Sequence, residues 1–188
     1  MGVEIGNRSI LGMNMRMNEL SGAVALAQTR KLDSIIATLR VKKAKLKEMF
    51  IGLPNFSFRK INDEIGECAT LLTLIFDTAD LAERFCEKIG CDPISYSGWH
   101  VYNNMEQVLN KVTGTAANCP YECPRFPTKR EYKKHMLPQT DDILARAVNI
   151  SVGIVDKGLG AVAGININSD DAEIESTGKH LANIIKHL

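Results

Sequence analysis

The fold of this 188-residue chain is decided by residues 17–50, which read MNELSGAVALAQTRKLDSIIATLRVKKAKLKEMF. Apolar residues recur in this stretch at steps of three and four without an intervening proline; they are Leu20, Val24, Leu32, Ile35, Ile36, Leu39, Leu46 and Met49. This spacing predicts one amphipathic helix, started by Asn14 or Asn18 and stopped by Gly52 and Pro54. Such a helix would be about 50 Å long, too long for one small domain to cover. We therefore expect it to connect two bodies or to cross a subunit boundary.

After residue 55 the apolar runs become shorter and alternate between helical and extended patterns. We expect a buried strand, an amphipathic helix, a second strand, a short helix, a third strand and a final helix, over residues 69–76, 77–89, 93–97, 141–147, 148–152 and 170–188. Residues 98–138 show little periodicity, and a stretch of that length is usually functional or poorly ordered. The pattern predicts an α/β chain, more narrowly an α+β small domain in which a long N-terminal helix precedes a small mixed sheet with helices.

Two parts of the chain differ in their pattern and define the expected domains. Residues 1–51 form the N-terminal segment and the long connecting helix, and residues 52–188 form the small C-terminal α/β domain.

Composition excludes several classes of protein. Hydrophobic residues make up 45% and charged residues 24% of the chain, which is ordinary for a globular protein. The formal charge of +1 gives no reason to expect a nucleic-acid or membrane partner. Glu4, Asn7 and Arg8 interrupt the N-terminus, and no stretch has the apolar length of a membrane span. Five cysteines, an odd number, predict free thiols and a cytoplasmic location.

A motif at the start of the predicted helix reads GMNMRMNELSGA over residues 12–23. It resembles a motif of the DegT/DnrJ/EryC1/StrS sugar aminotransferases, which are fold type I enzymes dependent on pyridoxal 5′-phosphate. The stretches that extend the resemblance are residues 25–28, 31–33, 137–138, 145–147 and 149–151, so that it covers most of the chain. The resemblance implies the C-terminal domain of such an enzyme, acting as a homodimer.

The resemblance also implies a cofactor-binding role for two residues of the motif. In the family, the asparagine at the position of Asn14 reaches the phosphate of the neighbouring subunit's pyridoxal phosphate. A side-chain amide is a suitable neutral donor to a phosphate oxygen. Arg16 would lie beside the same phosphate, since its guanidinium suits phosphate or carboxylate. The alternative is that Asn14 only caps a helix and Arg16 is a surface charge.

Residues 98–104, which read GWHVYNN, fall where the family places a substrate-facing loop. A sugar needs flat apolar surface together with hydrogen-bonding groups, and Trp99, His100, Tyr102 and Asn103 supply both. The segment lacks the prolines that the family commonly has around the histidine. It resembles a branch that acts on eight-carbon 3,8-dideoxy-octulosonate sugars. The alternative is an ordinary packed loop.

The resemblance implies an activity that needs a lysine absent from this chain. The complete enzyme would move an amino group from a donor such as glutamate to a keto-sugar, through a lysine that forms a Schiff base with the cofactor. In the family that lysine precedes the Gly12 motif, and the residues before Gly12 contain no lysine. Later basic residues look like the solvated face of a helix; they are Arg40, Lys42, Lys43, Lys45 and Lys47. We therefore expect no catalytic residue here and an inactive isolated chain. The alternative function is a non-catalytic dimerisation or interaction module.

The cysteines give no metal site. Cys119 and Cys123 are separated by three residues, and no further cysteine or histidine pair completes a four-ligand zinc site. Cys68, Cys86 and Cys91 sit in apolar contexts, where free cysteine behaves as a small hydrophobe. We expect packing rather than metal binding.

Overall fold

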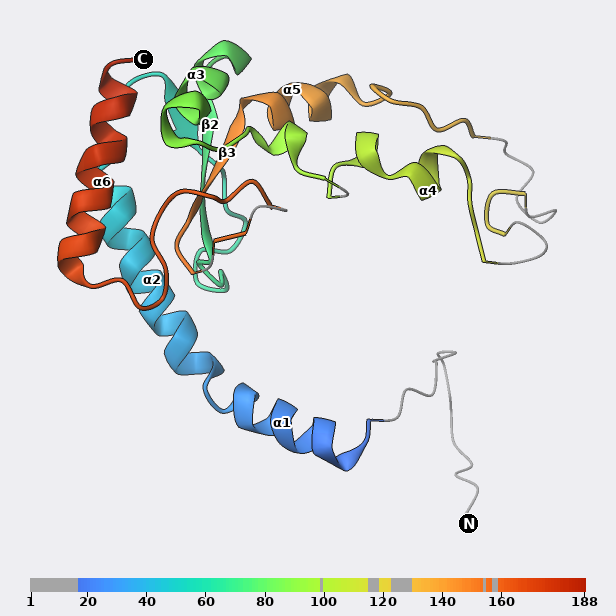
Figure 1. The fold of residues 1–188 in the computed structure, drawn as a ribbon, viewed down its shortest axis with the longest axis horizontal. Coiled ribbons are helices and arrows are strands. Elements are labelled where there is room, and N and C mark those ends of the chain that lie inside the picture. Colours follow the sequence, from blue (N-terminus) through green and yellow to red (C-terminus); the bar gives the residue numbers. More distant parts are fainter. Residues whose placement is uncertain (1–16, 99, 115–118, 123–129, 154, 157–158) are drawn as a thin grey trace. The chain divides into compact units, whose positions relative to one another are not determined.

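The computed structural model describes residues 17–98, 100–114, 119–122, 130–153, 155–156 and 159–188. The contacts divide the chain into two compact units, Met1–Ser34 and Ile35–Leu188. The elements, in chain order, are α1 (Glu19–Thr29), α2 (Leu32–Glu48), β1 (Phe56–Phe58), β2 (Leu71–Phe76), α3 (Ala79–Ile89), η1 (Ile94–Tyr96), η2 (Tyr102–Asn104), α4 (Glu106–Leu109), α5 (Pro138–Arg146), β3 (Ala147–Ser151) and α6 (Asp171–Lys186) (Figure 1). These helices and the small sheet confirm the predicted α+β fold.

The prediction of one continuous helix over residues 17–50 is wrong. Arg30 and Lys31 form a turn between α1 and α2. The Lys31 N–H bonds to the Gln28 carbonyl only three residues back, which tightens the last turn. The hydroxyls of Thr29 and Ser34 donate to backbone carbonyls on either side of the turn, at 2.8 Å each. These local bonds compete with the helix ladder, which the apolar spacing alone did not reveal.

A side-chain cap or a proline in the first turn marks where several helices begin. Asn18, one of the two predicted caps, accepts a bond from Ser21 N at 2.8 Å and starts α1. Pro138 is the first residue of α5, where its missing N–H costs nothing. Asp170 and Glu173 form a reciprocal capping box at the start of α6. The predicted helices over 77–89, 141–147 and 170–188 are confirmed as α3, α5 and α6, with small shifts at their ends.

The three strands pair antiparallel in the order β1-β2-β3. The predicted strands over 69–76 and 148–152 are confirmed as β2 and β3. In the described residues, the only parallel pairing is an isolated bridge between Ser151 and Gly164, so the expected mixed character of the sheet is limited to that bridge. β1, with three residues, is too short to have been predicted.

The predicted strand over residues 93–97 is wrong, because this segment forms the 3-10 turn η1. Tyr96 N bonds to Pro93 O at 3.0 Å, and Ser97 N bonds to Ile94 O at 2.9 Å. Short-range bonds therefore satisfy backbone groups that a strand would have offered to a neighbour. In residues 98–138, predicted to be irregular, the described part contains only η2 and α4.

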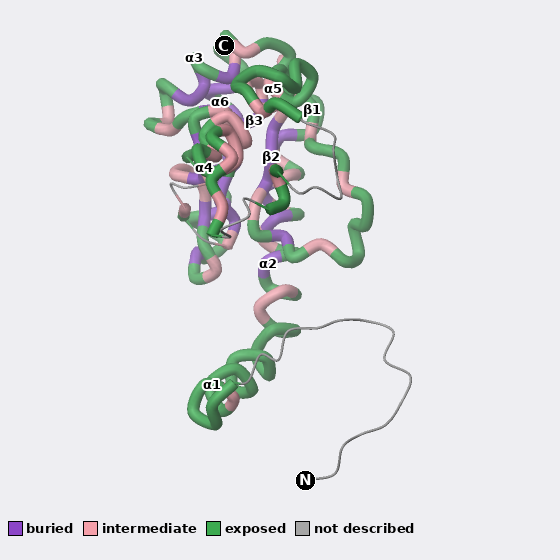
Figure 2. Tube along the Cα trace, turned by 90° about the vertical axis from the view of Figure 1, so that its right-hand side faces the viewer, coloured by how far each residue is buried: buried purple, intermediate pink, exposed green. Residues whose placement is uncertain are grey.

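The core lies against one face of the sheet. Leu72 pairs with Ile150 and Leu74 pairs with Val148, and side chains of directly paired residues share a face. All four are buried in one cluster with residues of α2, α3 and α6 (Figure 2). The opposite face carries a buried polar pair, in which the Thr73 hydroxyl donates to Asn149 Oδ1 at 2.8 Å. The sheet therefore has one apolar face and one partly polar face.

Two glycines allow close approach in this domain. Gly178 of α6 lies against Leu46 and Met49, so that a Cβ there would meet the Met49 sulfur. Gly164 has a φ of +131°, and a Cβ there would lie against the Ser151 backbone, with Ser151 N only 2.6 Å away. Bulk at residue 178 would meet a flexible side chain, whereas bulk at residue 164 would meet fixed backbone.

Within the described residues, no helix combines the length and the apolar character needed to cross a membrane.

Candidate functional site

A cavity of about 540 Å³ lies between the segments that follow α3 and the segment that leads into α5. Its polar lining comes from Ser95, Asn103, Asn104, Lys134, His135 and Asp141. Tyr96 adds an aromatic ring that is 65% exposed, and Val101 adds a buried apolar wall. A cavity of this size with a few convergent polar groups is the usual form of a small-molecule site.

Asp141, in the first turn of α5, is the hydrogen-bonding centre of this cavity. Its carboxylate accepts a bond from the Tyr102 hydroxyl at 2.9 Å and one from Asn103 Nδ2 at 2.8 Å. His135 Nδ1 lies 3.5 Å from its other oxygen. The Asp141 side chain is 21% exposed, so these bonds lie partly out of water. The N-terminal position on the helix also favours a negative charge.

The Tyr102 hydroxyl joins two segments of the chain. It donates to Asp141 and accepts from Leu137 N at 3.0 Å. Burial, together with the neighbouring Asp141 carboxylate, raises the pKa of Tyr102, against the opposing effect of the Leu137 N–H. The phenol therefore stays protonated and acts as a donor at neutral pH.

Asn103 makes the second connection between the same segments. Its Nδ2 donates to Asp141, while its Oδ1 accepts from His135 N at 2.8 Å. His135 has a φ of 59°, a conformation that a residue with a Cβ adopts only when its surroundings hold it there. The bond from Asn103 supplies part of that restraint. The geometry presents the His135 side chain, 76% exposed, at the cavity.

The structure brings together two of the four predicted substrate-binding residues. Tyr102 and Asn103 meet at Asp141, and Asn103 lines the cavity. His100 is exposed and is not among the residues that line it. Trp99 lies outside the described residues, as do the predicted cofactor-binding residues Asn14 and Arg16.

Sequence analysis missed Asp141, His135 and Lys134 as candidates for the site. Asp141 is 39 residues from Tyr102 and 38 from Asn103, so no local spacing connects them. The available signal was the position of Asp141 three residues after Pro138, where an acidic residue in a first helical turn is common. That signal predicts a helix start and not a binding site.

Lys43 is the buried lysine of the described residues, at 6% exposure. The interpretation of residues 40–47 as a solvated helix face is therefore wrong at this position. Its ammonium forms an ion pair with Glu67, and Arg59 Nη2 lies 3.6 Å from the same carboxylate oxygen. Burial lowers the pKa of Lys43, while the bond to Glu67 opposes that shift.

A lysine with a lowered pKa can form a Schiff base. The Lys43 amine, however, is paired with Glu67, and Lys43 does not line the cavity around Asp141. Lys43 therefore does not fit a role as the covalent partner of pyridoxal phosphate.

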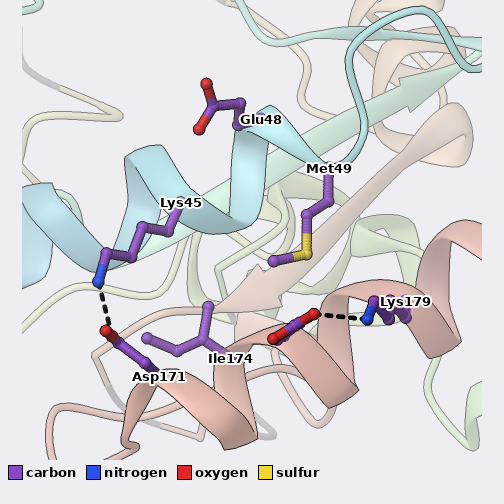
Figure 3. Close-up of a pocket in the computed structure, with 7 residues that line it drawn as sticks. Lys45, Glu48, Met49, Asp171, Ile174 and Lys179 are labelled. Atoms are coloured by element: carbon purple, nitrogen blue, oxygen red, sulfur yellow. Dashed lines mark hydrogen bonds and ion pairs between the residues drawn. The ribbon is translucent and has the colours of Figure 1, made fainter.

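A second cavity, of about 440 Å³, lies between α2 and α6 (Figure 3). Four of its charged groups form two pairs, Lys45 of α2 with Asp171 of α6 at 2.6 Å and Lys179 with Glu175 along α6 at 2.5 Å, while Glu48 also lines the cavity. Its apolar floor is formed by Ile174 and Met49. Because most of these charges neutralise each other in pairs instead of converging on one point, we favour the cavity around Asp141 as the functional site.

The cavity around Asp141 has the form of a site for a polar small molecule. Comparison with known families gives the class: residues 3–154 match the model of the DegT/DnrJ/EryC1/StrS aminotransferase family. The match spans most of the chain, and the chain belongs to this family. It includes the motif at residues 12–23, the loop at 98–104 and Asp141. Family membership supports a sugar-aminotransferase type of function and dependence on pyridoxal phosphate in general.

Proposed function

We propose that this chain supplies the small domain of a pyridoxal-phosphate-dependent aminotransferase that moves an amino group from glutamate to a keto-sugar. The family match over residues 3–154 carries the proposal. The cavity around Asp141 supports it, because hydroxyl-rich substrates need several donors and acceptors at fixed positions.

We further propose that the product is an acidic amino-sugar of the 8-amino-3,8-dideoxy-octulosonate type, so that the substrate is the corresponding keto-sugar acid. Lys134 offers an ammonium and Asn104 an exposed amide at the mouth of the cavity. An ammonium suits the carboxylate of an ulosonate, while amides suit its hydroxyl groups. Tyr96 offers an aromatic surface for the apolar face of a sugar ring. Trp99 and His100 belong to the same proposed substrate-facing loop.

The substrate class can be tested by titrating the chain with 3-deoxy-octulosonate and following amide chemical shifts. The expected result is saturable shifts in residues 95–104 and 134–141. Lys134→Met should weaken binding about tenfold, as the loss of one charge-assisted contact predicts. Lys133→Met is the matched control, since Lys133 does not line the cavity. Equal binding by both variants would contradict the proposed carboxylate contact.

Asn14 and Arg16 are proposed to bind the cofactor phosphate of a second subunit in a homodimer. When bound, pyridoxal phosphate holds the amino group between the two half-reactions. The role of this chain is then to bind the sugar and to close the neighbouring cofactor site. The described cysteines, which are free thiols, support a cytoplasmic location.

Because Lys43 does not fit the Schiff-base role, we propose that the chain alone does not catalyse transamination. When the isolated chain is mixed with pyridoxal phosphate, no absorbance band of a lysine adduct should appear. Treatment with borohydride should likewise leave no single lysine covalently labelled. Addition of a separately produced cofactor domain of the family should restore transfer from glutamate. A stable borohydride adduct on one lysine of the isolated chain would refute the proposal.

A non-catalytic dimerisation or interaction module is the second candidate. The observation that favours it is the exposed apolar surface of α1, on which Leu20 is 78%, Val24 54% and Leu26 54% exposed. α1 buries no residue in the described part of the chain. Association without restored activity in the same complementation experiment would support this alternative.

A further inference from the structure

Two cysteines meet where α3 ends. α3 stops at Gly90, whose φ of 70° is the left-handed conformation that ends many helices. The N–H groups of Gly90 and Cys91 both bond to the Cys86 carbonyl, the latter at 3.0 Å. This turn folds residue 91 back over the last helical turn. The sulfur atoms of Cys86 and Cys91 are consequently 3.2 Å apart.

The two thiols differ in exposure and in acidity. Cys86 is 2% exposed and belongs to the core, whereas Cys91 is partly exposed at its edge. The hydrogen bond between them lowers the pKa of Cys91, and the same bond together with burial raises the pKa of Cys86. When the pair loses one proton, Cys91 therefore carries the thiolate and Cys86 keeps its hydrogen as a donor.

We propose that Cys91 and Cys86 form an oxidation-sensitive pair that a small peroxide converts into an intramolecular disulfide. Cys91 is the residue that reacts with the peroxide, because it is the more exposed of the two and is the one that the hydrogen bond makes more acidic. Cys86 is the resolving residue, because the turn at Gly90 holds its sulfur within reach. This proposal is independent of the proposed aminotransferase function.

The chemistry is balanced with hydrogen peroxide as the oxidant. The Cys91 thiolate attacks one peroxide oxygen, so that an S–O bond forms, the O–O bond breaks and hydroxide leaves. Cys91 is now a sulfenic acid. The Cys86 sulfur then attacks Cys91 Sγ, and the S–O bond breaks as the S–S bond forms. The Cys86 proton leaves with the hydroxyl group as water. Two thiols have been oxidised, and one peroxide has been reduced to water.

The required movement is small. A disulfide needs a sulfur separation of about 2.05 Å, which is roughly 1 Å less than the present separation. Rotation of the partly exposed Cys91 side chain supplies this change without moving the helix. The neighbouring residues Gly90 and Asp92 line a cavity of about 230 Å³, which Tyr96 also lines. Tyr96 borders the cavity around Asp141 as well.

Peptide mapping of the whole chain tests the proposal directly. The chain is exposed to limiting hydrogen peroxide, remaining thiols are alkylated, and the denatured protein is digested with trypsin without reduction. Cleavage after Lys88 separates the two cysteines into peptides 85–88 and 89–111, each with one cysteine. A disulfide therefore joins two peptides that are otherwise separate. The expected product is this joined pair, abolished by reduction, formed before Cys68 is oxidised. Cys68 is exposed but has no thiol bonded to it in the described residues, so it reports unassisted oxidation.

Two variants separate the roles of the cysteines. In Cys86→Ala the Cys91 sulfenic acid has no resolving thiol, so dimedone should label Cys91. In Cys91→Ser, dimedone should leave Cys86 unlabelled. The wild-type chain is compared at a peroxide dose that already oxidises Cys68. If Cys86 and Cys91 are then both recovered fully alkylated, the proposal is overturned. The wild-type digest decides this even if a variant does not fold.

Discussion

Replacement of Gly164 by alanine tests the structure most sharply, because two physical costs coincide there. The φ of +131° is a conformation that residues with a Cβ rarely adopt, at a cost of about 1–3 kcal/mol. The added Cβ would also press on the Ser151 backbone and on Ile150 Cγ2, which is 3.0 Å away. Overpacking against groups that cannot move costs about 1–3 kcal/mol more. We expect Gly164→Ala to lower the free energy of unfolding by about 2–6 kcal/mol.

Gly52→Ala is the matched control for this experiment. Gly52 has a φ of +79°, but a Cβ there would meet nothing within 4 Å. It therefore carries the conformational cost of about 1–2 kcal/mol without the clash. Both changes reduce the entropy of the unfolded chain equally, so that effect cancels between them.

Urea denaturation followed by far-UV circular dichroism measures both variants. Gly164→Ala should lose clearly more stability than Gly52→Ala, with an unchanged slope. A loss of less than about 1 kcal/mol, or one equal to that of the control, would refute the close approach of residue 164 to β3.

Three further expectations concern charges. Glu67→Gln leaves Lys43 without its carboxylate, so urea denaturation should show a loss of about 1–3 kcal/mol, whereas the exposed Glu175→Gln should cost at most about 0.5 kcal/mol. The bonded cations Arg146, Lys45 and Lys179 lower the pKa values of Asp142, Asp171 and Glu175 respectively. Each of these carboxyls has a lower pKa in the folded chain than in the unfolded chain. Its contribution to the free energy of unfolding is therefore present above the unfolded pKa values of 3.8 to 4.5 and is lost as the pH falls below them. A free energy of unfolding that does not change between pH 5 and pH 3 would contradict this. Asp141→Asn weakens the bonds from Tyr102 and Asn103 by about 1–2 kcal/mol, so trypsin should cut after Lys133 and Lys134 about 5- to 30-fold faster. Its neighbour Asp142→Asn, which affects only the two bonds from Arg146, should leave that cleavage rate unchanged.

Sequence predicted the elements whose signals are local. Asp170 precedes its helix with a glutamate three residues later, and α6 begins there. The dense apolar run over residues 69–76 became the central strand. The break at residues 30–31 was missed because hydroxyl bonds to nearby carbonyls leave no trace in apolar spacing. The 3-10 turn at residues 94–96 was missed because its local backbone bonds, from Tyr96 N to Pro93 O and from Ser97 N to Ile94 O, likewise leave no trace in the apolar spacing.

The site was less predictable than the fold. Tyr102 and Asn103 were identified through a family resemblance, but their partner Asp141 could be found only once the chain had folded back on itself. The burial of Lys43 also depends on a distant residue, since Glu67 is 24 positions away. Lys43 stands four residues after Leu39 and three before Leu46, so the apolar periodicity already placed it on the buried stripe of the helix, and only its partner Glu67 lay beyond that signal.

The bonds around Asp141 limit what this site can do with a substrate. The Tyr102 hydroxyl already donates once and accepts once, and Asn103 uses both ends of its amide within the chain. A substrate that replaced these partners would leave groups of residues 135–141 without hydrogen bonds, at a cost comparable to what it gained. Tyr102 and Asn103 therefore fix the shape of the cavity. Recognition of the proposed sugar acid falls to the exposed groups that line the cavity, above all Lys134, Tyr96 and the carboxamide oxygen of Asn104, whose Nδ2 donates to Gly98 O at 3.0 Å. On this argument Lys134→Met should change substrate affinity without changing the rate of trypsin cleavage after Lys133, whereas Asp141→Asn should change both.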